Sequence, residues 1–308
     1  MTATEGVAPP DDAPTSAIIH LLIGVAAFAL QDAVVKWLTV GYPVSEIIFF
    51  RALFALPACL IVIRRDGGSR ALRTRRPGMH AARTLLLLGA LVSFFLALGA
   101  LPLADTVAIA FSAPIFMAAL SAPLLGERVG PRRWLAVLIG FAGVIVILRP
   151  GAGSFSPAAL LALISALCFA LGMIVTRQLG RSDTTAAIMF YFTLGTTVLG
   201  GLVAPFQWVA PDAVDFGLLA GLGLTGGVGA YCAVQAYRLA PVATVAPFEY
   251  SGLLWATLFG YAFWGDVPGS AVIMGAAILV ASNLYILRRE RRRGGGRGPG
   301  PARPDGGS

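Results

Sequence analysis

A few charged side chains interrupt the long apolar stretches of this 308-residue chain. Asp32, Lys36 and Arg51 lie in the first two stretches, and Glu249 follows Pro247 in the segment VAPFEYSG. If these stretches cross a membrane, a charge at the centre costs about 2.5–3.5 kcal/mol or more, so such residues mark ion pairs, proton sites or ligand contacts. Glu249 is therefore a candidate proton site or partner for a cationic group, and a buried, hydrogen-bonded structural glutamate is the alternative.

The first three charges lie close enough in depth to interact. At 1.5 Å per residue, Asp32 and Arg51 lie about 8 and 10 Å from the same membrane face, so we expect a pair between neighbouring helices. Lys36 is one helical turn beyond Asp32 and could pair with it along the same helix face. The three residues form either a structural ion-pair cluster or a functional group, which would be an outer gate or an anion site at Arg51.

These charges depend on the apolar stretches that carry them. Hydrophobic residues make up 57% of the chain and charged residues 12%, against about 25% charged residues in soluble domains. The blocks of about 20 apolar residues match a helix that crosses a ~30 Å hydrocarbon core, and they lack the alternation of barrel strands. The sequence predicts an all-α membrane protein with ten transmembrane helices, at residues 17–39, 44–63, 81–100, 105–125, 133–149, 157–177, 183–204, 215–237, 242–264 and 269–287.

The positive charges predict how the chain is oriented. Nearly all of the 23 Lys and Arg residues fall in the C-terminal segment or in alternate links, above all in residues 64–83. Because such links face the cytoplasm, we expect a multi-pass protein of the cell inner membrane with both termini cytoplasmic. This bias also accounts for the net charge of +8, so we expect contact with anionic lipids rather than nucleic acid.

The two halves of the chain repeat each other. FALQDAVVKWL (28–38) resembles FALGMIVTRQL (169–179), and the Thr-Val-Ala at 106–108 recurs at 244–246. Each half has five predicted spans, and an odd number places the halves in opposite orientations. We therefore predict two inverted five-helix repeats, 17–149 and 157–287, between a disordered N-terminal tail (1–16) and a basic, Gly/Pro-rich cytoplasmic tail (288–308). Such repeats are common in secondary transporters, which bind substrate between them near the midplane.

The repeat also directs attention to uncharged polar residues. If Phe190 is matched with Phe50, Tyr191 becomes the counterpart of Arg51. Glu249 falls opposite Phe111 and Pro247 opposite Ile109, so the second half carries a charge and a helix breaker that the first half lacks at those positions. Besides Tyr191, the side chains expected to line a cavity are Gln31, Tyr231, Gln235 and Tyr250.

Several longer elements carry a family resemblance. They are FFRALFALP (49–57), LADTVAIAFSAPIF (103–116), LLGERVGPRRWLAVLIGFAGVIVI (124–147) and AYRLAPVATVAPFEYSGLLWATLFGYAFWGD (236–266). Together they resemble the drug/metabolite transporter (DMT) superfamily, and in particular its ten-helix members with two EamA domains. FFR and AP-x-x-Y look closest to bacterial S-adenosylmethionine and riboflavin uptake carriers. The resemblance implies a monomer or weak homodimer that moves small metabolites by alternating access.

The sequence argues against an enzyme. It has two histidines and no H-E-x-x-H, G-x-S-x-G or P-loop motif. Its three cysteines form no C-x-x-C pair, and we expect neither metal nor cofactor. We predict an inner-membrane secondary transporter of a small organic metabolite (S-adenosylmethionine, riboflavin, an amino acid or a related compound), driven by protons or exchange. An exporter of the same fold is the alternative, followed by a channel or a scaffold without transport.

Overall fold

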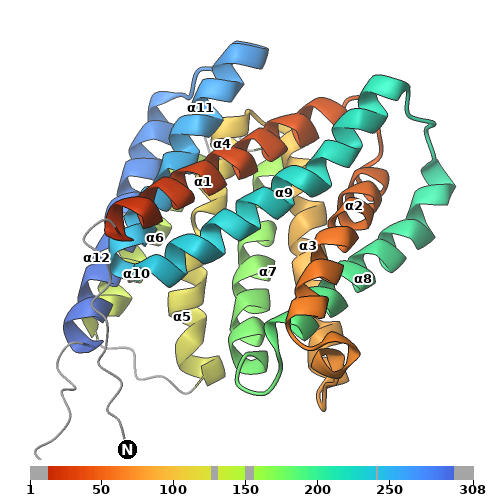
Figure 1. Ribbon diagram of the computed structural model, residues 1–308. Helices are drawn as coiled ribbons and strands as arrows, with labels where there is room; N and C mark the ends of the chain where they lie inside the picture. Colours follow the sequence, from red (N-terminus) through yellow and green to blue (C-terminus); the bar gives the residue numbers. More distant parts are fainter. Residues whose placement is uncertain (1–12, 126–130, 150–155, 241, 295–308) are drawn as a thin grey trace, which may run out of the picture.

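The computed structural model describes residues 13–125, 131–149, 156–240 and 242–294, and these residues form only helices and turns (Figure 1). The prediction of an all-α protein is confirmed. The helices are α1 (Ala13–Leu38), α2 (Val44–Arg65), η1 (Gly68–Leu72), α3 (Pro77–Ala100), α4 (Leu103–Ala110), α5 (Ala113–Leu125), α6 (Pro131–Leu148), α7 (Pro157–Leu179), α8 (Thr185–Val203), η2 (Ala204–Gln207), α9 (Ala213–Leu239), α10 (Val242–Val245), η3 (Ala246–Tyr250), α11 (Ser251–Trp264) and α12 (Ser270–Gly294).

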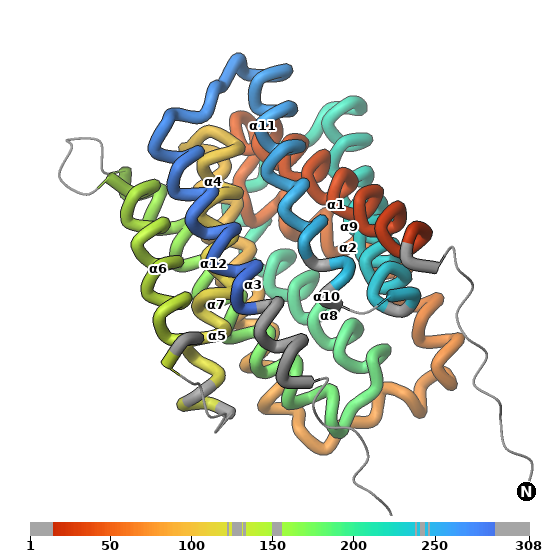
Figure 2. The backbone as a smooth tube through the Cα atoms, turned by 90° about the vertical axis from the view of Figure 1, so that its left-hand side faces the viewer, coloured from red at the N-terminus to blue at the C-terminus, as the bar shows by residue number. Residues whose placement is uncertain are grey.

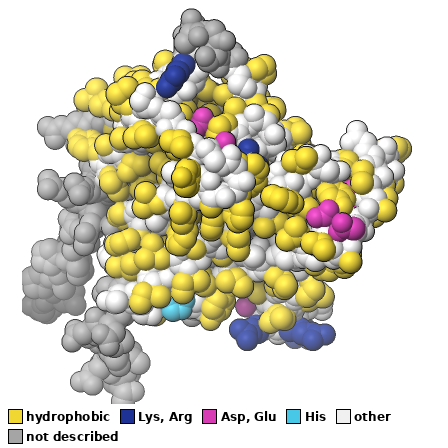
Figure 3. Space-filling model, turned by 90° about the horizontal axis from the view of Figure 1, so that it is seen from above, with side chains coloured by type: hydrophobic (Ala, Val, Ile, Leu, Met, Phe, Trp, Pro, Cys, Tyr) yellow, Lys and Arg dark blue, Asp and Glu magenta, His cyan; other side chains and the backbone are white. Residues whose placement is uncertain are grey.

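Much of the helical surface is suited to lipid. Seven helical segments in the described part of the chain are long and apolar enough to cross a membrane, and two shorter apolar helices accompany them. Large apolar side chains stay exposed on the outside, such as Leu138, Leu254 and Ile273, which are 62%, 73% and 60% exposed. Hydrophobic side chains also dominate the face seen in Figure 3. The protein is a multi-pass membrane protein, and the count of ten crossings remains a prediction.

The helices pack in pairs that follow the internal repeat. α1 packs along α9, α3 along α7, α2 along α8 and α6 along α12 (Figures 1 and 2). If α1 to α3 correspond to α7 to α9, the pair α1–α9 becomes the pair α7–α3, while α2–α8 and α6–α12 map onto themselves. This pattern is the one that two inverted repeats produce, and it places α1 and α9 beside each other across the centre of the molecule.

Glycines allow α9 to approach its neighbours closely. A Cβ added to Gly223 would lie 2.5 Å from the Cβ of Phe54 on α2, and one added to Gly229 would lie 2.9 Å from the ring of Phe28 on α1. Both distances are shorter than a van der Waals contact, so only glycine fits at these positions. The glycine-rich sequence of α9 thus sets its spacing from α1 and α2.

Two of the expected spans are interrupted. The span 242–264 divides into α10, η3 and α11, because Pro247 lacks the N–H that a continuous helix requires. The span 105–125 divides into α4 and α5 at Phe111 and Ser112, just before Pro114. Here Asn283 Nδ2 of α12 donates to the freed carbonyl of Phe111 over 3.2 Å. The expectation that only the second half contains a helix break is therefore wrong.

Matching contacts join the repeats at both ends of the molecule. We call the end at residues 39–43 the outer end and the end at 66–76 the inner end, following the predicted orientation. At the outer end, Tyr42 Oη donates to Asp215 Oδ2 over 2.8 Å. At the inner end, His80 Nε2 lies 2.6 Å from Asp183 Oδ2, and Thr74 Oγ1 donates to the same oxygen over 2.6 Å.

These two contacts are related by the repeat. Tyr42 and Asp183 are 141 residues apart, as are the ends of α1 and α7 at Leu38 and Leu179. Their partners, Asp215 and His80, both lie in the first turn of a repeat-related helix, α9 or α3. Burial alone would raise the pKa of Asp183, but the hydrogen bonds of Thr74, His80 and Ser182 outweigh it and lower that pKa below its ordinary value.

Candidate functional site

The two helix breaks meet at a cavity of about 240 Å³ beside α1. The cavity extends along α1 from Leu21 to Asp32, roughly 16 Å at 1.5 Å per residue. Asp32 and Glu249 both line it, although they are expected at different membrane depths. The other lining residues are Gly24, Val25, Phe28, Ala29, Val107, Phe111, Ala233, Gly252 and Ala256. Two carboxyl groups and two phenylalanine rings therefore face one space between the repeats.

Glu249 is held by a residue that sequence reasoning missed. Tyr237 Oη, near the end of α9, donates to Glu249 Oε1. Tyr237 is not among the tyrosines that sequence analysis expected to line a cavity, Tyr191, Tyr231 and Tyr250. The turn between α9 and α10 folds the chain back, so that residues 12 positions apart meet. The acidic group is thus oriented by a tyrosine while its side chain stays exposed to the cavity.

Tyr250 lies at the junction of the two breaks. Its ring packs against the ring of Phe111 with centroids 5.2 Å apart. Because Phe111 ends α4 and Tyr250 ends η3, this contact joins the interruption of the first repeat to that of the second. Tyr250 is therefore placed beside the cavity that Glu249 lines.

Asp32 and Arg51 attract each other but are not in direct contact. Both side chains are partly buried, and each is the main opposite charge that acts on the other. In the described part of the chain, an ion pair within 4 Å joins His80 to Asp183, whereas Asp32 and Arg51 do not form one. The guanidinium of Arg51 instead lines a second cavity, between α2, α3, α8 and α9.

Gln31 and Arg51 converge on one glycine of α9. A Cβ added to Gly226 would lie 2.6 Å from Gln31 Oε1 and 3.8 Å from Arg51 Nη2. Gln31 is only 4% exposed, and its Oε1 atom has no hydrogen-bond partner. Asp32 lines the first cavity, and its neighbour on α1, Gln31, approaches Gly226, which lines the second.

The expected pairing of Lys36 with Asp32 is wrong. Lys36 Nζ donates to the carbonyls of Leu98 and Leu101 at the end of α3, over 3.2 and 2.5 Å. It also lies 5.3 Å from the ring centroid of Trp264. The last carbonyls of a helix lack partners within the helix, and the ammonium group satisfies them here instead of pairing along α1.

Three other predicted cavity residues lie elsewhere. Tyr191 is at the inner end, where its hydroxyl donates to the carbonyl of Leu72 over 3.0 Å and its ring lies 4.5 Å from that of His80. Tyr231 is 59% exposed on α9, and Gln235 follows one turn later. Sequence analysis identified all three by residue type, but the structure does not place them on the walls of the Asp32–Glu249 cavity.

The first residues of α2 and α8 suggest a second alignment beside the predicted match of Tyr191 with Arg51. α2 begins at Val44 and α8 at Thr185, which is an offset of 141. With that offset Arg51 corresponds to Phe192, and Phe192 lines the same cavity as Arg51.

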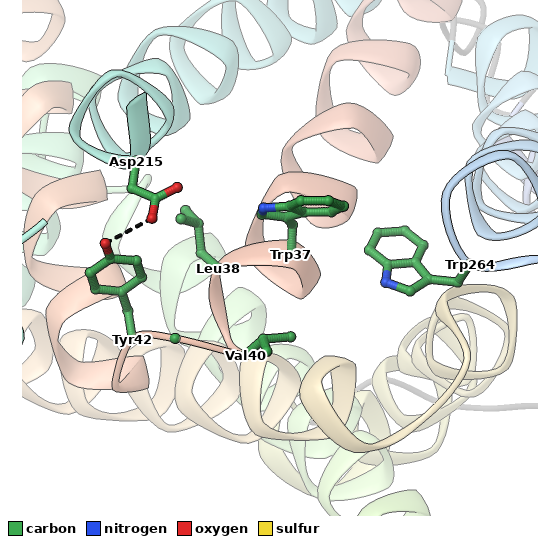
Figure 4. Close-up of a pocket in the computed structure, with 7 residues that line it drawn as sticks. Trp37, Leu38, Val40, Tyr42, Asp215 and Trp264 are labelled. Atoms are coloured by element: carbon green, nitrogen blue, oxygen red, sulfur yellow. Dashed lines mark hydrogen bonds between the residues drawn. The ribbon is translucent and has the colours of Figure 1, made fainter. Parts of the chain in front are cut away.

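Two tryptophans border a third cavity, at the outer end. It has a volume of about 330 Å³ and lies between Trp37 and Trp264, beside the Tyr42–Asp215 hydrogen bond (Figure 4). Figure 4 shows the two indole rings on opposite sides of this space. Indoles near a membrane interface also anchor helices.

Comparison with known proteins agrees with this arrangement. The model of the EamA-like transporter family matches residues 15–149 and 156–288. A riboflavin transporter of Rhizobium johnstonii is 31% identical over 296 residues, 95% of this chain and 97% of the relative. An S-adenosylmethionine uptake transporter of Rickettsia prowazekii is 26% identical, over 89% of this chain and 93% of the relative.

Export occurs among the relatives as well. The pseudopaline exporter CntI of Pseudomonas aeruginosa is 27% identical over 283 residues, 90% of this chain and 97% of the relative. A solved crystal structure superposes with a TM-score of 0.61 at 21% identity, over 89% of this chain and 98% of the other. This last match supports the fold.

Proposed function

The chain belongs to the EamA-like transporter family, and we propose that it is an inner-membrane secondary carrier that takes up a small organic metabolite. That it is a transporter of the DMT superfamily and not an enzyme follows from the family match and the transporter relatives. The substrate, the direction of transport and the coupling are our proposals. So are the repeat boundaries at residues 17–149 and 157–287, the cytoplasmic termini and a monomeric or weakly dimeric state.

The cavity lined by Asp32 and Glu249 carries the proposal. It lies where two interrupted helices meet, and secondary transporters bind substrate at such breaks because backbone and side-chain polar groups face a space there. Its two carboxyl groups favour an organic cation, and the rings of Phe28 and Phe111 offer faces for a flat or methylated group. We propose that the substrate has a cationic part that occupies this cavity.

Glu249 and Tyr237 are the proposed proton-coupling pair. A carboxyl group that faces the cavity and accepts a hydrogen bond can bind either a proton or the substrate cation. Competition between the two would couple uptake to the proton gradient. Exchange of one metabolite for another is the alternative coupling.

The proposed gates are the two contacts that join the repeats: Tyr42–Asp215 is the outer gate, and His80–Asp183 is the inner gate. Each joins one repeat to the other at one end of the molecule. In alternating access one contact would open while the other stays closed, as expected of elements related by an inverted repeat.

Uptake by purified protein in proteoliposomes tests the proposed function. We expect saturable uptake and counterflow of at least one of S-adenosylmethionine, riboflavin or an amino acid. The first two compounds are named for relatives of this chain, and the third is the other predicted class. Non-saturable flux without counterflow would indicate a channel, and efflux without uptake would indicate an exporter like CntI. An unchanged pH dependence in Glu249→Gln would exclude the proton role of that residue.

A further inference from the structure

The cavity between α2, α3, α8 and α9 has the chemistry of an anion site. It has a volume of about 170 Å³, and Arg51, Arg83, Thr193 and Thr196 are among its lining residues. We infer that it binds a carboxylate group of the transported substrate. This inference rests on the proposed function and extends it, because it makes the substrate a zwitterion.

The walls of this cavity carry two positive charges and no carboxylate. Besides the four residues above, it is lined by Ala52, Ala55, Ala58, Cys59, Met189, Phe192, Leu222, Gly223, Gly226, Gly227 and Ala230. Two arginines that line one space within the membrane favour an anion there. The acidic group that attracts Arg51 is Asp32 of α1, which lines the neighbouring cavity.

Arg83 is held in place by neutral partners. Its Nε donates to Thr176 Oγ1 over 2.6 Å, and its Nη1 donates to the carbonyl of Ile188 over 3.0 Å. Its guanidinium also lies 5.2 Å from the ring centroid of Phe192. Arg83 is only 9% exposed. These contacts fix the orientation of the side chain but leave its charge without a carboxylate partner in the described part of the chain.

Other polar groups at this cavity also lack partners. Thr196 is 1% exposed, and its hydroxyl has no hydrogen-bond partner. The Nε of Arg51 is likewise buried and unpartnered. Buried polar groups in native proteins are nearly always hydrogen-bonded, so a group of unpartnered ones needs an explanation. A carboxylate accepts from both a guanidinium and a hydroxyl, so it is an acceptor of the kind that each of these atoms lacks.

The position of this cavity favours a zwitterion over a simple acid. Arg51 lines it, and Asp32, the residue that attracts Arg51, lines the neighbouring cavity with Glu249. A ligand with a carboxylate at one end and a cationic group at the other would place one group in each cavity. A lipid phosphate could meet the same arginines, so the test includes a lipid comparison.

Matched ligand pairs test this inference. The full-length transporter in detergent is titrated with S-adenosylmethionine and its decarboxylated form, and with phenylalanine and phenethylamine, while thermal unfolding reports binding. We expect the carboxylate-bearing member of at least one pair to bind about 10- to 100-fold more tightly, which is the effect of one charge-assisted hydrogen-bonded group.

Variants assign that preference to the cavity. Arg83→Gln and Thr196→Val should reduce the preference for the carboxylate at least fivefold while changing the affinity for the amine less than twofold. Arg83→Lys, which keeps the charge, should retain part of it, and Arg64→Gln on the exposed end of α2 is the matched control. Equal binding of both members of each pair, or a preference that survives Arg83→Gln and Thr196→Val, would overturn the inference.

Two further results would also overturn it. One is stabilisation by phosphatidylglycerol that depends on Arg83, with no preference between the ligand pairs, since the site would then hold a lipid headgroup. The other is uptake of riboflavin without binding of any member of the pairs. Because riboflavin has neither a carboxylate nor a cationic group, the carrier function would then stand, but the cationic part proposed for the substrate would not. Absence of transport for every compound would count against the carrier function itself, whereas the binding result would still decide the anion site.

Discussion

The hydrogen bond between Tyr237 and Glu249 provides the sharpest test of the proposed site. Tyr237→Phe removes the hydroxyl that donates to Glu249 and leaves the ring in place. A hydrogen bond to a charged group contributes about 1.5–3 kcal/mol, and Glu249 is exposed to the cavity, so we expect the lower end of this range. That corresponds to roughly a tenfold loss in kcat/KM for uptake, because about 1.4 kcal/mol changes a rate or equilibrium tenfold.

The assay is a double-mutant cycle measured by uptake into proteoliposomes. If Tyr237 acts through Glu249, the double variant Tyr237→Phe/Glu249→Gln should transport no worse than Glu249→Gln alone. Tyr231→Phe, on the same helix but 59% exposed, is the matched control and should transport normally. Effects that add within about 0.5 kcal/mol would mean that the two residues act independently, which would refute this reasoning.

Other predictions follow from single contacts. Gly223→Ala should reduce stability by about 1–3 kcal/mol and impair uptake, because the new Cβ would lie 2.5 Å from the Cβ of Phe54 and 2.6 Å from its backbone. Gly217→Ala, with nothing within 4 Å, should be neutral in thermal unfolding. Because the pKa of Asp183 is lowered from 3.8, its stabilising effect should be complete above about pH 4 and decline as the pH falls through the folded-state pKa. The Asp183→Asn variant should therefore unfold at a lower temperature than the wild type at pH 6. Between pH 5 and 3 its unfolding temperature should decrease less than that of the wild type; equal decreases in the two proteins would contradict this. Lys36→Gln should lower the unfolding temperature, because the hydrogen bonds to the end of α3 are lost. The decrease should be the same in an Asp32→Asn background; a smaller decrease there would mean that Lys36 pairs with Asp32 after all.

Much of the fold could be predicted from the sequence because the membrane limits the choices. An apolar block of about 20 residues can only become a spanning helix, so hydropathy identified nearly every segment. The family was also predicted correctly, since FFRALFALP and AYRLAPVATVAPFEY combine in one chain. The break at Phe111 was missed, because the proline that accompanies it, Pro114, lies three residues further on, and local signals place a helix break less well than they indicate a helix.

The site was only partly predictable. Asp32 and Glu249 were identified from the cost of placing a charge in the membrane, and the structure brings them to one cavity. Arg83 was counted among the basic residues of a cytoplasmic link, and only its packing against Phe192 places it in a cavity. Tyr237 was missed because tyrosine alone is a weak signal in a membrane helix.

The sequence by itself thus determined the helical class, the membrane location, the repeated halves and the charges that must be buried, because each depends on composition or spacing along the chain. Only the tertiary structure decided the partners: Lys36 bonds to the end of α3 instead of Asp32, and Glu249 meets Tyr237. A side chain selects its partner by distance and direction in space. Those depend on how α1 and α9 pack across the two repeats, which no local pattern in the chain specifies.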